Sequence, residues 1–306
     1  MKKQFLQQNL FWLLLLSYGC HDSYTGKTSI ITPTGDPGVK SIFINGDSLH
    51  YIDIGKGEPV VFVHGALGDY RTWRSQVDQF ARNHRVIAYS RRYAWPNQKT
   101  MMDDSKHSFV SHGKDLTEFL KKLRLPPVHL VGHSSGAFIA LLAAIDHPEL
   151  VRSLTLGEPP VMSLLPPPSP SDVNPFARAV VAFSNNEQQK AVQEFVSVVT
   201  GDSTYFSKLP QMDREVMMMN TQEARANATL QNIMPLTSCD DLKRITCPVL
   251  LVGGDQSPSF FPAILNKMEP CLRNKERVTL QRTSHGLEYE SPFEFNKVVL
   301  SFIDKH

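Results

Sequence analysis

The chain contains 306 residues, a length that suits one large domain or two smaller ones. Its 32 basic and 30 acidic residues leave a formal net charge of +2, which argues against nucleic-acid binding and against an acidic disordered chain. Beyond the N-terminus no apolar run approaches the roughly 18 residues of a membrane span, so the sequence excludes a protein with several spans.

The N-terminal segment has the pattern of an export signal. Lys2 and Lys3 precede the apolar run of residues 10–16. A short apolar run behind basic residues is typical of a secretory signal and is too short to span a bilayer. We therefore expect residues 1–20 to be a signal peptide and the polar residues 21–40 to be a flexible tether.

The apolar run ends in Ser17-Tyr18-Gly19-Cys20, which resembles the lipobox of bacterial lipoproteins, where the cysteine is acylated at the mature N-terminus. Ser17 departs from the leucine that is usual at that position, so a plain signal peptide cut nearby is the alternative. Both interpretations predict an exported protein. We expect it to be periplasmic, or to be anchored to a membrane through a lipid on Cys20.

Three further cysteines, Cys239, Cys247 and Cys271, are scattered along the chain. Their number and spacing predict neither a disulfide framework nor a CxxC zinc site. We expect small buried residues with at least one free thiol, because the number is odd.

From residue 41 onward, strand-like segments alternate with helical ones. Residues 41–45 and 49–54 flank Gly46-Asp47 and predict a hairpin, while residues 59–63 form an apolar run typical of a strand buried on both faces. We expect similar strands at 86–89, 128–131, 154–156, 249–252 and 278–280, and helices at 73–81, 109–123, 137–145, 263–272 and 293–303. This alternation predicts an α/β fold with a mostly parallel, doubly wound sheet.

The alternation stops between about residues 159 and 237. This segment opens with proline-rich stretches, continues with helical patterns rich in Gln, Met and Ala, and contains no clear parallel strand. We expect a helical cap inserted over the strand ends of one domain, residues 41–306.

The strongest chemical signal is Gly132-His133-Ser134-Ser135-Gly136, which lies between a predicted strand and a predicted helix. G-x-S-x-G in that context predicts a nucleophile elbow, a tight turn with small flanking residues that exposes the Ser134 hydroxyl. The backbone N–H of Ser135, at the start of the helix, is a candidate oxyanion donor.

A serine nucleophile needs a base, and the base needs an acid that orients it. His285 and Asp255 each follow a predicted strand, so the order along the chain is Ser134, Asp255, His285. We predict this set as the catalytic triad. Glu158 also follows a strand and is the competing acid, with a substrate-side polar group as its other interpretation.

His64-Gly65-Ala66 follows the strand at 59–63, where the backbone N–H of Ala66 is expected to supply the second oxyanion donor. Arg91 and Arg92 follow the strand at 86–89. They are candidates for binding a substrate carboxylate, with loop bracing or a solvated face as the alternative.

On these motifs the chain resembles the α/β-hydrolase fold superfamily of the serine type, with a lid. The resemblance implies an esterase-like enzyme that cleaves a small or medium ester or lactone through an acyl-enzyme, without a metal or other cofactor. Serine at position 134 differs from the aspartate of the epoxide hydrolases and haloalkane dehalogenases of this fold. Hydrolysis of a C–C bond, perhydrolysis and a ligand-binding homologue with slow turnover remain open. Oligomeric state is left unpredicted.

Overall fold

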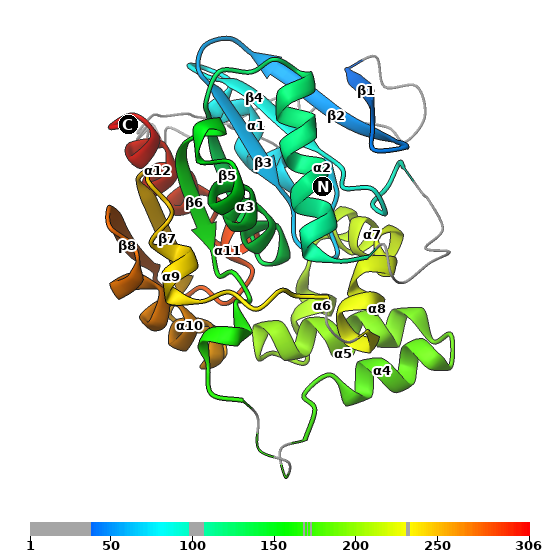
Figure 1. Cartoon of the computed structure of the whole chain (residues 1–306). Helices are drawn as coiled ribbons and strands as arrows, with labels where there is room; N and C mark the ends of the chain where they lie inside the picture. Colours follow the sequence, from blue (N-terminus) through cyan, green and yellow to red (C-terminus); the bar gives the residue numbers. More distant parts are fainter. Residues whose placement is uncertain (1–37, 98–106, 168, 170, 172, 231–232) are drawn as a thin grey trace, which may run out of the picture. The chain divides into compact units, whose positions relative to one another are not determined.

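Eight strands form one sheet in the order β1-β2-β4-β3-β5-β6-β7-β8 (Figure 1). This computed structural model describes residues 38–97, 107–167, 169, 171, 173–230 and 233–306. The strands are β1 (Val39–Ile44), β2 (Asp47–Gly55), β3 (Pro59–Val63), β4 (Arg85–Tyr89), β5 (Val128–His133), β6 (Val151–Gly157), β7 (Val249–Gly254) and β8 (Lys275–Leu280). The pairs β1–β2 and β2–β4 are antiparallel, and the five remaining pairs of neighbouring strands are parallel, which confirms the predicted α/β fold.

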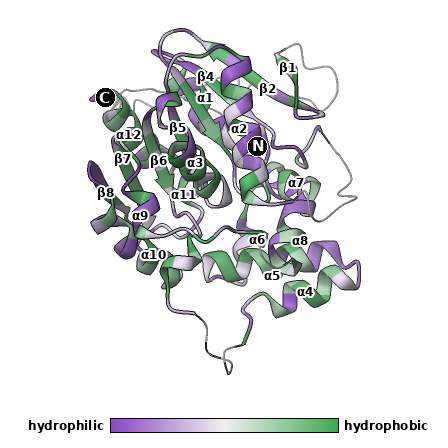
Figure 2. Cartoon of the chain, viewed as in Figure 1, coloured by the Kyte–Doolittle hydropathy of each residue, from purple (hydrophilic) through white to green (hydrophobic). Residues whose placement is uncertain are grey.

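The central strands are buried on both faces because helices cover the two sides of the sheet. On one side α2 (Phe109–Lys122) packs against α3 (Ser135–Asp146), and on the other α1 (Arg74–Phe80) packs against α12 (Pro292–Ile303) (Figure 1). Strands β3, β5 and β7 are accordingly buried along their length, and β3 and β7 carry almost only apolar residues (Figure 2). The short helices η1 (Tyr70–Trp73), η3 (Pro148–Leu150), α10 (Phe260–Met268), η5 (Glu269–Cys271) and α11 (Leu287–Glu290) complete this part.

Between β6 and β7 the chain forms a group of helices at the end of the sheet (Figure 1). They are α4 (Ala177–Ser184), α5 (Gln188–Thr200), α6 (Tyr205–Lys208), α7 (Gln211–Met219) and α8 (Thr221–Thr229), preceded by η4 (Met162–Leu164). These helices, here called the cap, share a small apolar core that includes Phe183, Phe195 and Ala224. Ala66 and Leu67 of the loop after β3 belong to the same cluster, so the cap packs directly on that loop.

Buried polar contacts also hold the cap on the sheet domain. Asn220, between α7 and α8, donates its side-chain amide to Asp69 at 2.7 Å and accepts from the backbone N–H of Trp95 at 2.7 Å. Arg74 of α1 forms an ion pair with Asp213 of α7. Directional contacts of this kind define the orientation of the cap more narrowly than apolar packing alone.

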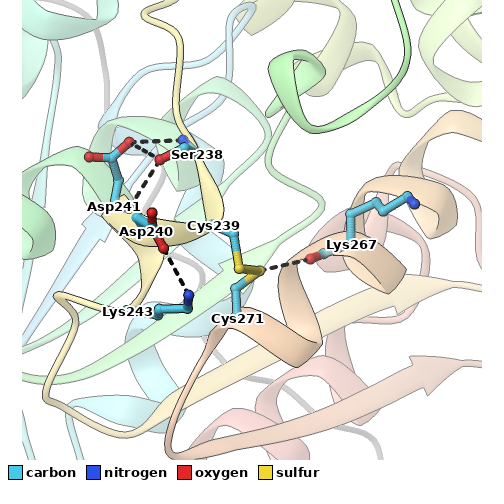
Figure 3. The surroundings of a disulfide bond; sticks show 7 residues. All are labelled: Ser238, Cys239, Asp240, Asp241, Lys243, Lys267 and Cys271. Atoms are coloured by element: carbon cyan, nitrogen blue, oxygen red, sulfur yellow. Dashed lines mark hydrogen bonds and ion pairs between the residues drawn. A yellow bond between two sulfur atoms is a disulfide. The ribbon is translucent and has the colours of Figure 1, made fainter.

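Cys239 and Cys271 form a disulfide, a pairing that the sequence did not predict (Figure 3). Cys239 begins α9 (Cys239–Leu242), just after the cap, and Cys271 ends η5. The two residues are 32 positions apart in sequence, and the packing of α9 against η5 brings their Cα atoms to 5.2 Å. Cys247 is buried and free, as expected for one thiol of the three.

The predicted signal peptide (1–20), Cys20 and most of the predicted tether (21–40) lie outside the described residues. Strand β1 begins at Val39 and therefore includes the last two residues assigned to the tether. Within the part of the chain that the structure covers, none of the helices combines the length and apolar character needed to cross a membrane.

Candidate active site

The turn between β5 and α3 holds Ser134 in a strained backbone conformation, with φ 54° and ψ −127°. A non-glycine residue with positive φ is uncommon and persists only where the surrounding structure enforces it. Here the backbone N–H of Ser134 donates to the Gly157 carbonyl of β6 at 2.7 Å, and the Ser134 carbonyl accepts from Ala137 at 3.0 Å. These bonds hold the turn that the sequence predicted.

Two glycines make the turn sterically possible. A Cβ atom at Gly136 would lie 2.2 Å from the Val63 carbonyl oxygen and 2.4 Å from that of His64. At Gly132 it would lie 2.6 Å from the Cα of Ala137. Close approach of backbone to backbone therefore requires glycine at both positions, and places Ser134 beside the loop that follows β3.

His285 is buried in the loop between β8 and α11, and its partner is Glu158. The Nδ1 atom of His285 lies 2.7 Å from Oε2 of Glu158, which is fully buried. Glu158 immediately follows β6 with φ 45°, and its other oxygen accepts from the backbone N–H of Gly254 at 2.9 Å. The carboxylate is thus fixed by one bond on each oxygen.

The structure corrects the prediction that Asp255 is the acid of the triad. Asp255 is exposed, and its carboxylate accepts from the backbone N–H of Thr283 at 3.1 Å. A backbone hydrogen bond from Arg282 lowers the pKa of Asp255 most, and the bond from Thr283 lowers it further. The side chain therefore closes the turn after β8, while Glu158 from the neighbouring strand occupies the space beside the imidazole.

The sequence signal for Glu158 was its position just after a strand, and in the structure this strand lies beside the one that ends in Gly253-Gly254. A Cβ at Gly253 would lie 3.4 Å from Oε1 of Glu158, and one at Gly254 would lie 2.2 Å from the Thr283 carbonyl. Gly254 is thus required by the nearby Thr283 carbonyl, and its backbone N–H donates to the Glu158 carboxylate at 2.9 Å. Glutamate, one methylene longer than aspartate, extends from the end of β6 to His285.

Ser134 and His285 line one cavity, which encloses about 530 Å³ including its mouth. The loop after β3 contributes Ala66, and the cap contributes mostly apolar side chains. The described lining residues are Gly65, Ala66, Leu67, Gly68, Thr72, His133, Ser134, Phe195, Val196, Val199, Thr200, Tyr205, Met217, His285, Gly286 and Tyr289. No Lys, Arg, Asp or Glu is among them.

Arg91 and Arg92 do not line this cavity, so their prediction as substrate-binding residues is wrong. Both are buried. Arg92 forms an ion pair with Asp115 of α2 at 2.6 Å, and Arg91 forms one with Glu223 of α8 at 2.5 Å. Each guanidinium is neutralised inside the protein and is not available to a substrate carboxylate.

A second buried histidine–glutamate pair lies next to the first, and the sequence analysis missed it. Nδ1 of His133 lies 2.9 Å from Glu288, and Nε2 of His133 lies 2.7 Å from the backbone carbonyl of His285. Burial acts to lower the pKa of His133, but the Glu288 carboxylate raises it overall. The signal for this pair was weak: an acidic residue three positions after His285, at the start of α11.

The pKa of His285 is lowered from 6.5, first by burial and then by the nearby His133 charge, against the opposing effect of Glu158. A lowered pKa keeps the imidazole neutral at pH 7, the form that can accept a proton. The two imidazole ring centres are 4.7 Å apart, which accounts for the influence of one histidine on the other.

Comparison with known proteins agrees with this architecture. Among curated proteins, the (E)-2-((N-methylformamido)methylene)succinate hydrolase of Acinetobacter baylyi is 19% identical over 274 residues, covering 85% of this chain and 95% of that protein.

Solved structures with a similar fold include Est816, described as an N-acyl homoserine lactone degrading enzyme, with a TM-score of 0.69 and 22% identity. That match covers 86% of this chain and all of Est816. The esterase EaEST from Exiguobacterium antarcticum has a TM-score of 0.70 at 19% identity, covering 87% of this chain and 99% of the esterase. The family profile for the alpha/beta hydrolase fold matches residues 58–292. The chain therefore belongs to the α/β-hydrolase fold family, whose members include hydrolases such as these.

Proposed function

We propose that this protein is a serine hydrolase that cleaves an uncharged carboxylic ester or lactone of small to medium size through an acyl-enzyme. The observation that carries the proposal is the arrangement of three residues. Ser134 and His285 line one cavity, and the Nδ1 atom of His285 lies 2.7 Å from the buried carboxylate of Glu158. An alcohol, an imidazole and an orienting acid in this arrangement support nucleophilic catalysis.

In the proposed reaction His285 takes the hydroxyl proton as the Ser134 oxygen attacks the substrate carbonyl carbon. The backbone N–H groups of Ala66 and Ser135 hold the resulting oxyanion. His285 then gives its proton to the leaving alcohol as the C–O bond breaks, leaving the acyl group on Ser134. Water attacks the acyl-enzyme with His285 again acting as base, which releases the carboxylic acid and restores the serine. Glu158 stabilises the imidazolium in both steps.

The cavity favours an uncharged acyl group because its described lining contains apolar cap residues and no Lys or Arg, and because the His133 imidazole is already paired with Glu288. The name of the Acinetobacter baylyi relative describes its substrate as a succinate, which carries carboxylate groups and so differs from the uncharged substrate proposed for this chain. The lactone-degrading neighbour Est816 supports including lactones in the proposed class.

The test combines a fluorophosphonate probe with a matched pair of esters. The probe should label the wild-type protein but not Ser134→Ala, and that variant should lose hydrolysis of 4-nitrophenyl butyrate. The mono-4-nitrophenyl ester of succinic acid has a similar length but carries a charge, and should be cleaved at least about tenfold less efficiently. Lack of labelling of the folded wild type would favour a ligand-binding protein and contradict the proposal.

We further propose that the protein is exported, either as a periplasmic protein or as a lipoprotein acylated at Cys20. The Cys239–Cys271 disulfide supports this proposal because such bonds persist in oxidising compartments. Mass analysis of the mature N-terminus should find cleavage near Cys20, with or without acyl chains. A mature protein that retains Met1 would contradict export by this signal.

A further inference from the structure

A buried cation lies behind the loop that follows β3. Arg91 is only 2% exposed, and its Nη2 atom lies 2.9 Å from the backbone oxygen of Gly65 and 3.2 Å from Oγ of Ser135. One guanidinium therefore contacts both segments that, under the function proposed above, supply the oxyanion donors. The first is the peptide before Ala66 and the second is the start of α3.

Three donors converge on the Gly65 carbonyl. Besides Arg91, they are the ring Nδ1 of His64 at 2.8 Å and the backbone N–H of Gly68 at 3.2 Å. His64 is fully buried, and its pKa is well below 6.5, mainly because of burial and then because of the Arg91 charge. The ring is therefore neutral and donates through Nδ1, which leaves Nε2 to accept the backbone N–H of Arg91 at 3.0 Å.

The Gly65 carbonyl and the Ala66 N–H belong to the same peptide unit. In a trans peptide these two groups point in opposite directions, so fixing one fixes the other. We propose that Arg91 is the positioning residue of the oxyanion hole. By holding the Gly65 oxygen away from the cavity it directs the Ala66 N–H into it, and its charge polarises that peptide so that the N–H donates more strongly.

The cap supplies the counter-charge. Glu223 of α8 is 2% exposed and lies 2.5 Å from Nη2 of Arg91. Without this carboxylate the buried guanidinium would be unpaired, which is costly in a protein interior. One ion pair thus links the cap to the residue that binds the Gly65 carbonyl of the oxyanion loop.

Arg92 provides a matched control. It is the adjacent residue, is also buried, and pairs with Asp115 at 2.6 Å and with Asp47 at 3.4 Å. Its hydrogen bonds go to Asp115, and neither the Gly65 carbonyl nor Ser135 is among its partners in the described part of the chain. The test compares Arg91→Met/Glu223→Met with Arg92→Met/Asp115→Leu. The Arg91 double variant removes one buried ion pair, whereas the Arg92 double variant removes the pair with Asp115 and also the contact of Arg92 with Asp47. The loss of folding stability should therefore be at least as large in the Arg92 control.

The measurements are kcat and KM for 4-nitrophenyl butyrate, and inhibition by a boronic acid whose tetrahedral serine adduct places an oxygen in the oxyanion hole. The Arg91 double variant should lose about 30-fold in kcat with KM changed by less than about threefold, and boronate affinity should fall in parallel. The Arg92 double variant should keep both kcat and boronate affinity within about threefold of wild type.

Arg91→Lys is a second variant for the case in which the double variant does not fold. Lysine keeps the cation near Glu223 but lacks the planar fork, so we expect a loss of about fivefold to tenfold in kcat and in boronate affinity. Unchanged kcat and boronate affinity in a folded Arg91 variant would overturn the proposal, as would an equal loss in the Arg92 control. Fluorophosphonate labelling of the wild type reports on the proposed function separately, because it requires only a reactive Ser134.

Discussion

Replacing Glu158 by glutamine distinguishes the two acidic residues that follow neighbouring strands. In the structure Oε1 of Glu158 accepts from the Gly254 N–H, and Oε2 lies 2.7 Å from Nδ1 of His285. The glutamine oxygen would keep the bond from Gly254, so the amide NH2 would face the imidazole. A donor at that position favours the tautomer protonated on Nε2, which cannot accept the Ser134 proton.

The expected loss is large because the carboxylate also stabilises the imidazolium formed in the reaction. Both side chains are buried. Two unit charges about 4 Å apart at an effective dielectric near 20 attract by about 4 kcal/mol. With about 1.4 kcal/mol for each factor of ten, the charge alone contributes roughly 10³ in kcat. In serine proteases the equivalent neutral amide costs about 10⁴, so we expect a loss of about 10³ to 10⁴.

The control is Asp255→Asn. The Asp255 carboxylate is exposed and accepts from the Thr283 N–H, a bond that an asparagine oxygen can also accept. We therefore expect kcat within about threefold of wild type. The assay is hydrolysis of 4-nitrophenyl butyrate from pH 5 to 9, with circular dichroism to show that both variants are folded. The reasoning is refuted if folded Glu158→Gln keeps kcat within about tenfold of wild type while Asp255→Asn loses more.

Three further predictions follow from the geometry. Burial lowers the pKa of His285, so kcat/KM should be retained at pH 7 and fall on acidification with a midpoint below 6.5; a midpoint above 7 would contradict this. Gly136→Ala should prevent folding because its Cβ would lie 2.2 Å from a backbone oxygen of β3. Gly113→Ala in α2 is the control: its Cβ would lie 3.6 Å from the nearest atom, so it should raise the free energy of unfolding by about 0.5–1 kcal/mol in urea titrations. Cys239→Ser/Cys271→Ser opens a loop of 32 residues and should cost about 3–4 kcal/mol of unfolding free energy without changing kcat; equal urea midpoints would show that the bond does not stabilise the fold.

The order of strands and helices was predictable from the sequence because it depends on local patterns. Continuous apolar runs such as residues 59–63 mark strands buried on both faces, and they alternate with amphipathic helical segments. The elbow at Ser134 was predictable for the same reason. Both glycines that the turn requires lie within the same five residues as Ser134, and the strand before the turn and the helix after it can each be recognised from their own sequence patterns.

The pairing of side chains from different strands was decided only by the tertiary structure. Asp255 and Glu158 both follow strands, and sequence order favoured Asp255. The choice between them depends on the positive φ of Glu158, on the backbone N–H of Gly254 at the end of β7 and on the longer glutamate side chain.

The partners of the buried arginines and of the cysteines could likewise not be predicted from the sequence. Arg91 pairs with Glu223, and Cys239 bonds to Cys271, through contacts between segments far apart along the chain. A one-dimensional pattern records which residue types are present and how they are spaced. Which buried charge or thiol meets which partner depends on strand order and helix packing in three dimensions, because the cost of burying an unpaired group is decided by what lies next to it.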